Sequence, residues 1–394
     1  MKRVDVLVVG AGPAGSSATI RLARDGASVL VVDRAVFPRD KPCGGGLTLR
    51  AVRELPVSPD PVVEHVVRRM GFRLFYRRRF QRSAAAPLVL MTQRRRLDHY
   101  LVEQAAAAGA EVRQGAKLSA LSADDAHVTA TVGGEQVEAQ IVVGADGANG
   151  TSRKLLGLGE GHRPFVALEG NVSKKLAGSR YDGVAEFELG TIRGGYGWAF
   201  PKGDHVNVGV WGDESEATSL RRHLAELCRA HGLDPSAVSE LRGHRLPLRR
   251  AGSVAARGRA LLVGDAAGVI DPLSGDGMFE AFASSRLAAE TIADFLAGRV
   301  EHLDGYTEKL SRALGLGAAA SWGAKIAFDR YPRLTFALGR MPLAWGVVER
   351  MLSGELRHPG DQRGPARLGL KMIEGLAKRA GDPGAGFRTE AGTA

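Results

Sequence analysis

Cysteine is scarce in this chain of 394 residues, where Cys43 and Cys228 are the only two. They lie far apart, and neither belongs to a CxxC pair or to a Cys/His pattern with the spacing of a zinc site. A disulfide framework, a zinc centre and an iron–sulfur cluster held by cysteines are therefore excluded. So few thiols are typical of a reducing compartment, and we expect a cytoplasmic protein.

Long hydrophobic runs are also missing. The first apolar run, Val4 to Val9, is six residues long and leads into a glycine turn, too short for a signal-peptide core or a membrane span. We expect a protein that is soluble or peripheral on the inner face of a membrane. Near the end, Leu368, Met372 and Leu376 repeat at helical spacing among basic side chains, which is typical of an interfacial helix.

Positive charge is in excess, with a formal net charge of +11 and a sequence pI near 9.9. Charge alone leaves open a nucleic acid, an anionic membrane surface, a phosphorylated substrate or an arginine-rich proteome. The segment Arg68–Ser83 interleaves aromatic residues with arginines, but no RNA- or DNA-binding motif accompanies it. We expect no nucleic-acid partner, and lipid-headgroup or phosphate recognition remains open beside an ordinary basic solvent-facing sheet.

The N-terminal stretch VDVLVVGAGPAGSSATIRLARDGASVLVVDR predicts strand, tight turn, helix and strand. Gly10, Gly12 and Gly15 have the GxGxxG spacing, and Asp33 closes the second strand. Gly10 permits the turn, Gly12 lets a pyrophosphate approach the helix N-terminus, and Gly15 allows close packing of helix on sheet. Asp33 is expected to hydrogen-bond the adenosine ribose, so the stretch predicts a dinucleotide site.

Two later segments bear on which dinucleotide binds, because the glycine loop does not separate NAD from FAD. An apolar strand ends near Asp146, and another ends at Asp265 before a loop and a long helix that begins near Gly277. Both carboxylates fall at the C-terminal edge of the sheet, where ligands bind in open α/β folds. Asp265 suits a ribityl hydroxyl, and the helix at Gly277 would direct its positive end at a flavin.

With the glycine loop, these segments resemble FAD-dependent aromatic hydroxylases and prenyl reductases as far as about residue 290. The resemblance implies an α/β fold: a FAD-binding Rossmann-like domain of the aromatic-hydroxylase type, an inserted mixed-sheet substrate domain and a helical C-terminal region. We assign residues 1–70, 90–165 and 250–300 to the first domain and 71–89 and 166–250 to the second. Residues 301–380 form the helical region, and 381–394 are expected to lack fixed structure.

Three motifs narrow the resemblance: PCGGG at 42–46, YxWxFP at 196–201 with a following NVG, and GDAAG with a later P and GDG. In this order they resemble the geranylgeranyl reductase family, flavoproteins that saturate isoprenoid double bonds. The family usually has GEG where this chain has Gly275, Asp276 and Gly277. The resemblance places Cys43 beside the flavin as the first residue to test. The alternatives are that Cys43 is a buried, inert cysteine and that the aromatic residues of YxWxFP only form the core of a sheet.

The resemblance implies the following site residues. Catalytic roles fall to Cys43 and Tyr196, and substrate contacts to Gly44, Gly45, Trp198, Phe200 and Pro201. FAD is expected to contact Gly10, Gly12, Ala14, Gly15, Asp33, Arg34, Cys43, Gly44, Arg94, Asp146, Asp265, Gly275, Gly277 and Met278.

The expected reaction is hydride transfer from reduced FAD to a prenyl double bond, with a proton delivered to the other carbon. No strong acid stands out in the motifs, so Cys43, Tyr196 or a trapped water is expected to donate it. The chain has no second GxGxxG unit, and NAD(P)H or ferredoxin is expected as electron donor. A prenyl diphosphate, prenyl lipid, menaquinone tail or chlorophyll-type ester all fit as substrate, and the oligomeric state stays open. The alternatives are a flavin monooxygenase or halogenase, an electron-transfer partner to quinone, and a flavin-free prenyl escort, which the intact glycine loop disfavours.

Overall fold

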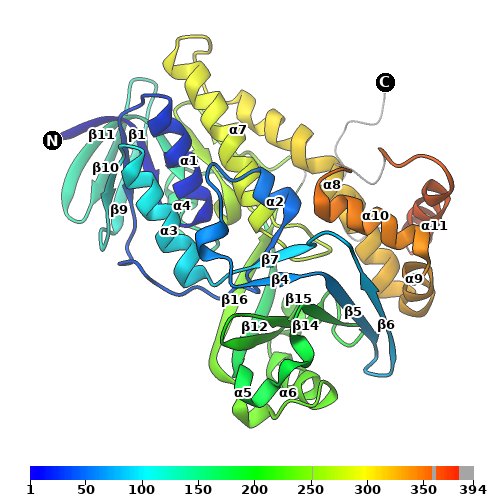
Figure 1. Ribbon diagram of the computed structural model, residues 1–394. Helices are drawn as coiled ribbons and strands as arrows, with labels where there is room; N and C mark the ends of the chain where they lie inside the picture. The colour runs from blue at the N-terminus through cyan, green and yellow to red at the C-terminus, as the bar shows by residue number, and fades with distance from the viewer. Residues whose placement is uncertain (251, 357–360, 381–394) are drawn as a thin grey trace.

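The computed structural model describes residues 1–250, 252–356 and 361–380. The chain builds two large sheets with helices packed around them, and a helical lobe at one side of the molecule (Figure 1). The first sheet has the order β17-β18-β11-β1-β2-β8. Its parallel strands are β1 (Lys2–Val9), β2 (Val29–Val32), β8 (Glu111–Arg113), β11 (Glu135–Gly144) and β18 (Ala260–Leu262), with β17 (Ala256–Arg257) antiparallel at the edge.

The first sheet is buried on both faces, as expected for parallel strands with continuous apolar sequences. Val6, Leu7 and Val8 of β1 have no exposed surface. Helices α1 (Pro13–Arg24) and α7 (Met278–Leu296) pack against each other, and α3 (Arg94–Ala107) packs on α1. The antiparallel hairpin of β9 (Leu118–Ala123) and β10 (Val128–Val132) extends from β11. This arrangement places the C-terminal ends of β1, β11 and β18 side by side, next to the start of α1.

The second sheet has seven strands in the order β16-β12-β15-β14-β13-β5-β6 and is antiparallel except for the β13/β5 pair. Its strands are β5 (Arg69–Leu74), β6 (Arg78–Ser83), β12 (Arg163–Ser173), β13 (Val184–Leu189), β14 (Tyr196–Pro201), β15 (His205–Asp213) and β16 (Ser239–Leu248). Helix α6 (Leu220–Ala230) covers one face through Leu220, Leu224 and Leu227. Strands β5 and β6 thus join one sheet with strands that follow about 80 residues or more later in the chain. The division into domains remains a prediction.

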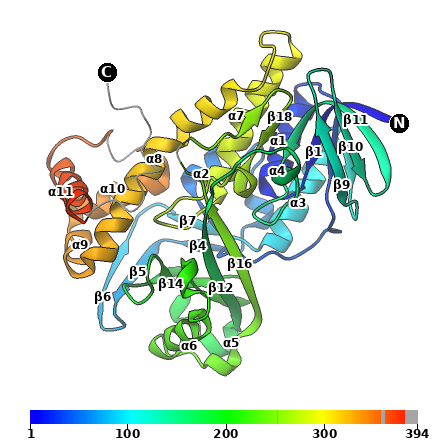
Figure 2. The ribbon, with the colours of Figure 1, turned by 180° about the vertical axis from the view of Figure 1, so that it is seen from behind.

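A small three-stranded sheet completes the body of the molecule, in the order β3 (Gly46–Thr48), β7 (Val89–Met91) and β4 (His65–Val67). The short helix α2 (Leu49–Arg53) directly follows β3. Four helices, α8 (Gly305–Arg330), α9 (Pro332–Gly339), α10 (Pro342–Ser353) and α11 (Pro365–Arg379), form the lobe seen from both sides in Figures 1 and 2. The α/β fold with a helical C-terminal region is therefore confirmed.

The apolar residues expected on an interfacial helix belong to α11, where Leu368 and Met372 are exposed and Leu376 is half-buried. Among the described residues, no helix is both long enough and apolar enough to cross a membrane. The prediction that residues 381–394 lack fixed structure lies outside the described residues.

Candidate functional site

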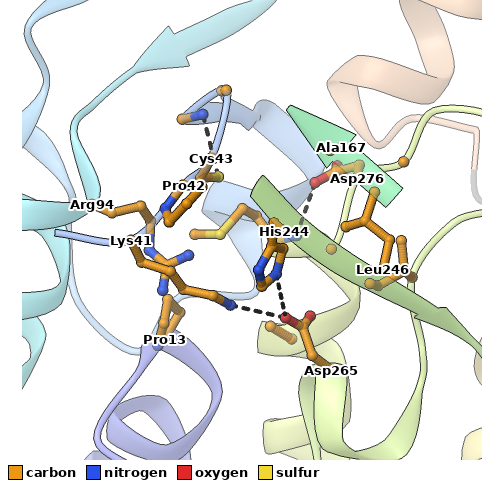
Figure 3. A pocket seen from close by; sticks show the side chains of 18 of the residues that line it. Pro13, Lys41, Pro42, Cys43, Arg94, Ala167, His244, Leu246, Asp265 and Asp276 are labelled. Atoms are coloured by element: carbon orange, nitrogen blue, oxygen red, sulfur yellow. Dashed lines mark hydrogen bonds and ion pairs between the residues drawn. The ribbon is translucent and has the colours of Figure 1, made fainter. Parts of the chain in front are cut away.

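A cavity of about 570 Å³ lies between the two large sheets. One end is lined by the start of α1 and the residues after β2, and the other by aromatic side chains of the second sheet. Between the two ends lie the loop Arg39–Gly46 and the start of α7. Figure 3 shows this middle part, where Lys41, Pro42 and Cys43 face His244 and Asp265 across the cavity.

The glycine loop at the first end is tightly built. Gly10 has a φ of +104°, and a methyl group on Gly15 would lie 1.8 Å from the carbonyl oxygen of Gly10. Gly12 is the N-cap of α1, whose first turn no side chain caps. Asp33 accepts hydrogen bonds from the backbone N–H of Ala11 and of Ala35, each at 2.8 Å, and lines the cavity. An uncapped helix N-terminus that faces a cavity favours a phosphate group there.

Two arginine side chains lie next to this loop. Arg94 is buried and forms a bidentate pair with Asp98 at 2.6 and 2.7 Å, and Arg39 contacts the same carboxylate at 2.7 Å. Burial lowers the pKa of Arg94, but Asp98 more than offsets it, so the net direction is upward. Both guanidinium groups lie within 4 Å of the position that a side chain on Gly12 would take. Arg34, an exposed residue, lines the same end of the cavity.

Asp146 and Asp265 line the middle of the cavity, as expected from the strand ends. Asp146 accepts hydrogen bonds from the backbone N–H groups of Thr151 and Ser152 and from the Ser152 hydroxyl, so its carboxylate also shapes the local turn. Asp265 pairs instead with two basic side chains from distant segments.

Those partners of Asp265 are Lys41, whose Nζ lies 2.9 Å from Oδ2, and His244 of β16, whose Nε2 lies 3.7 Å from it. Burial raises the pKa of Asp265, but Lys41 and His244 outweigh burial and hold it well below its usual range. The three residues join the two large sheets across the cavity (Figure 3). Sequence reasoning missed Lys41 and His244, because neither belongs to the strand that carries Asp265.

The start of α7 provides a second helix N-terminus at the cavity, where the backbone N–H of Met278 donates a hydrogen bond to Oδ1 of Asp276 at 2.8 Å. Gly277 is its N-cap, without a side-chain hydrogen bond, and Met278 begins the helix. A methyl group on Gly277 would lie 3.4 Å from Oδ1 of Asp265. Ala14, Gly275, Gly277 and Met278 all line the cavity, whereas Gly10 and Gly15 lie behind it. Two helix N-termini, an acidic residue after β2 and arginines over the glycine loop together fit a flavin dinucleotide.

The PCGGG loop is held by two buried groups from the second sheet. Glu169 of β12 accepts a hydrogen bond from the backbone N–H of Cys43 at 2.7 Å. Lys202, 2% exposed, donates to the carbonyl oxygens of Gly44 and of Thr92. Burial raises the pKa of Glu169 and lowers that of Lys202. A carboxylate within a buried strand and a lysine after FP were the available signals, and sequence reasoning used neither.

The glycines of this loop are required by close contacts. A side chain on Gly45, whose φ is +69°, would meet Nζ of Lys202 at 1.9 Å and the Thr92 carbonyl oxygen at 2.1 Å. One on Gly44 would lie 3.0 Å from the Phe200 ring. The Cys43 Sγ accepts a hydrogen bond from Gly45 N–H at 3.3 Å, and the residue is half-buried at the cavity wall.

Aromatic rings line the far end of the cavity. Tyr196, Trp198 and Phe200 alternate along β14 and so share one face of the sheet. Their rings contact one another, with centroids 6.3 Å apart for Tyr196 and Trp198 and 6.1 Å for Trp198 and Phe200. Pro201 is buried at the end of the strand and does not line the cavity. Phe187 and Trp211, which sequence reasoning missed, complete the aromatic wall.

The Tyr196 hydroxyl donates a hydrogen bond to the carbonyl oxygen of Ser274, and burial raises its pKa well above the usual range. Beside it lies an acidic cluster that was not expected from the motifs. Asp276 lines the cavity, and the Arg50 guanidinium lies 4.0 Å from its carboxylate and 3.7 Å from that of Glu280. Burial raises the pKa of both carboxyl groups despite Arg50.

Comparison with known proteins agrees with this geometry. Residues 3–314 match the family described as FAD binding domain. The chain is 34% identical over 316 residues to a menaquinone reductase of Mycolicibacterium smegmatis, covering 73% of this chain and 76% of that protein. It is 32% identical over 309 residues to a geranylgeranyl diphosphate reductase of Rhodobacter capsulatus, covering 75% and 76%.

Solved structures show the same fold. A geranylgeranyl bacteriochlorophyll reductase-like protein from Thermoplasma acidophilum superposes with a TM-score of 0.76 at 20% identity, covering 98% of this chain and 97% of the other. A flavin-dependent brominase has a TM-score of 0.76 at 20% identity, covering 96% of this chain and 100% of the other. The family match covers more than half of the chain, and the two relatives exceed 30% identity. The chain therefore belongs to the FAD-binding-domain family, in the geranylgeranyl reductase group of FAD-dependent oxidoreductases.

Proposed function

We propose that this protein saturates carbon–carbon double bonds in a geranylgeranyl or longer polyprenyl chain. The observation that carries the proposal is the aromatic and aliphatic end of the cavity, which opens directly beside the loop that contains Cys43. A long apolar chain needs such a wall, and the relatives are named for reduction of geranylgeranyl diphosphate or menaquinone. The candidate substrates are a prenyl diphosphate, a prenyl lipid, a menaquinone tail and a chlorophyll-type ester.

When bound, reduced FAD supplies the hydride for such a reduction. In this proposal Asp33, Arg94 and the starts of α1 and α7 hold the dinucleotide. Gly44, which faces the Phe200 ring, leaves space for the alkene beside the loop, and the aromatic rings exclude water from the alkene. The faces of Tyr196 and Trp198 stabilise positive charge that develops at the alkene carbon.

Three side chains at this wall are candidate proton donors. Cys43 borders the loop, Tyr196 has its hydroxyl hydrogen bonded to Ser274, and Asp276 lies beside Arg50. Burial raises the pKa of the Asp276 carboxyl group, which favours its protonated form, and a protonated carboxyl group can act as a general acid. We propose Asp276 as the donor, with Cys43 and Tyr196 as the alternatives expected from the motifs.

Single variants distinguish the three donors. Asp276→Asn, Cys43→Ser and Tyr196→Phe are each compared for flavin content and for turnover of reduced protein with substrate. Loss of at least about a hundredfold in turnover with full flavin content identifies the donor, because general acid catalysis contributes that much or more. Equal turnover in all three variants would refute the assignment and favour a trapped water.

The reaction itself is tested without oxygen. Photoreduced protein is mixed separately with geranylgeranyl diphosphate and with a menaquinone, and flavin reoxidation and product mass are followed. A gain of two hydrogens within the prenyl chain supports prenyl reduction and identifies the head group, whereas a gain of two hydrogens on the quinone ring means only that quinol has formed. Reoxidation only after oxygen is admitted would favour a monooxygenase or halogenase, the second candidate, which the shared fold of the brominase keeps in view.

The electron donor and the location of the protein complete the proposal. NAD(P)H and ferredoxin are the candidate donors, and anaerobic reduction of the flavin by each one distinguishes them. We propose a cytoplasmic protein with a peripheral contact on the inner face of the membrane, since a prenyl lipid or a quinone resides there.

A further inference from the structure

Two segments that are remote in sequence meet at one surface of the molecule. The hairpin of β5 and β6 lies against α9 and α10, as both ribbon views show (Figures 1 and 2). Phe80 of β6 packs edge-on against Phe336 of α9, with ring centroids 5.0 Å apart. The Arg82 guanidinium donates a hydrogen bond to the carbonyl oxygen of Arg340, just after α9. The basic hairpin and the helical lobe thus form one continuous surface.

The helical part of this surface is an apolar corner, formed by Leu334, Met341, Pro342 and Leu343. Leu334 lies in α9, and Met341 lies between the two helices as the N-cap of α10. The backbone N–H of Met341 donates to the Leu338 carbonyl oxygen, and α10 begins at the next residue, which keeps Leu343 at the same turn. Leu334, Met341 and Leu343 are 44%, 48% and 52% exposed, so the corner presents large apolar side chains to solvent.

The hairpin beside the corner is strongly basic. The segment 68–83 contains seven arginines and no aspartate or glutamate. Arg77, Arg78 and Arg79 at its end are exposed, and none of them pairs with a carboxylate within the described part of the chain. Arg333 and Arg340 are exposed next to the corner and are likewise without a carboxylate partner among residues 1–250, 252–356 and 361–380.

We propose that the β5–β6 hairpin and the apolar corner together dock the protein on an anionic lipid bilayer. An apolar group flanked by unpaired arginines matches the two parts of a bilayer surface, with the corner in the acyl boundary and the arginines among the headgroups. A protein partner with an acidic, apolar groove would match the same charges, but several exposed arginines spread over two elements suit a continuous layer of anionic headgroups better. This surface is distinct from the exposed face of α11.

Strand β5 and helix α10 of this surface also line the cavity. Met70 of β5, Phe187 of β13 and Leu352 of α10 all belong to the apolar end of the cavity. A prenyl tail that leaves the bilayer at this surface would therefore have a short path to the cavity. This link to the cavity rests on the proposed function, whereas docking on the bilayer does not.

Vesicle binding of the full flavin-loaded chain tests the proposal without substrate or turnover. Co-sedimentation is measured with phosphatidylcholine vesicles, with and without phosphatidylglycerol. We expect binding to the mixed vesicles and much weaker binding to phosphatidylcholine alone. Arg78→Glu with Arg79→Glu should raise the lipid concentration for half-binding by roughly 20-fold or more, since each arginine near an anionic surface contributes about a fivefold gain.

Matched variants elsewhere on the surface control for net charge and for apolar area. Arg221→Glu with Arg222→Glu, on α6, makes the same change of charge at exposed positions. For the corner, the double variant Leu334→Gln, Leu343→Gln is compared with the double variant Val36→Gln, Leu176→Gln. Val36, in the loop after β2, and Leu176, in α5 (Lys174–Ala177), are exposed residues elsewhere on the molecule. We expect both control pairs to bind mixed vesicles within about threefold of the parent protein, because their surfaces do not enter the bilayer.

Other outcomes overturn the proposal. Equal weakening by the hairpin pair and the α6 pair would mean that only net charge matters. If the corner variant binds mixed vesicles as tightly as its control pair, the apolar corner does not belong to the bilayer interface. Failure of the parent protein to bind mixed vesicles, together with a lower molar mass for the corner variant in light scattering, would assign the corner to a second copy of the chain. Because no turnover is measured, these results stand whether or not prenyl reduction is observed.

Discussion

Replacing Lys202 by methionine tests how the loop beside Cys43 is held. The ammonium group is buried and donates hydrogen bonds to the carbonyl oxygens of Gly44 and Thr92. Methionine has a similar length but no hydrogen-bond donor. The carbonyl groups of Gly44 and Thr92 would each lose a hydrogen bond, and Glu169 would lose a nearby positive charge. The perturbation therefore acts on the loop that lines the cavity and not on the aromatic wall.

The expected loss follows from these contacts. A hydrogen bond to a charged group contributes about 1.5–3 kcal/mol, and Lys202 donates to two carbonyl oxygens. We take about 3–5 kcal/mol as the fall in the free energy of unfolding. For 394 residues the entropy of unfolding is about 0.8 kcal/mol/K, so the midpoint of thermal unfolding should fall by about 4–6 °C.

Two assays check this result. Thermal unfolding is followed by flavin fluorescence and by circular dichroism, with Lys154→Met as a control at an exposed position, expected to change stability by less than about 0.5 kcal/mol. Thiol labelling is measured in a Cys228→Ser background, where Cys43 is the one remaining cysteine. Faster labelling of Cys43 is expected once the loop is loosened. A Lys202→Met protein with the parent midpoint and the parent labelling rate would refute this account of the loop.

Three further changes probe the flavin site. Gly15→Ala should yield protein without bound flavin, because the added methyl group would meet the Gly10 carbonyl oxygen at 1.8 Å; the absorbance spectrum of the purified protein checks it. Asp265→Asn should destabilise the protein at neutral pH, since the depressed carboxylate pKa reports stabilisation by Lys41. That stabilisation is present above the unfolded pKa of about 3.9 and is lost as pH falls toward the folded value, so parent and variant midpoints should converge in strong acid. Tyr196→Phe removes one hydrogen bond and should lower stability by about 1 kcal/mol in urea unfolding while flavin remains bound.

Local patterns were sufficient for the first nucleotide unit. The run of apolar residues before Gly10, the glycine spacing and Asp33 belong to one contiguous stretch, so neighbouring residues determine its strand, turn and helix. The same holds for the start of α7 at Gly277 and for the alternation along β14. In each case the period of the side chains, 3.6 or 2, is a property of the chain itself.

Contacts between distant segments were decided only by the tertiary structure. Glu169 and Lys202 reach the loop of Cys43 because the second sheet folds over the first, and no local pattern marks a buried charge whose partner lies more than a hundred residues away. The sequence of the arginine-rich hairpin likewise does not show which distant segment it packs on, and only the tertiary structure brings Phe80 against Phe336. Residue spacing determines which face of an element a side chain occupies, but the packing of elements determines what that side chain meets.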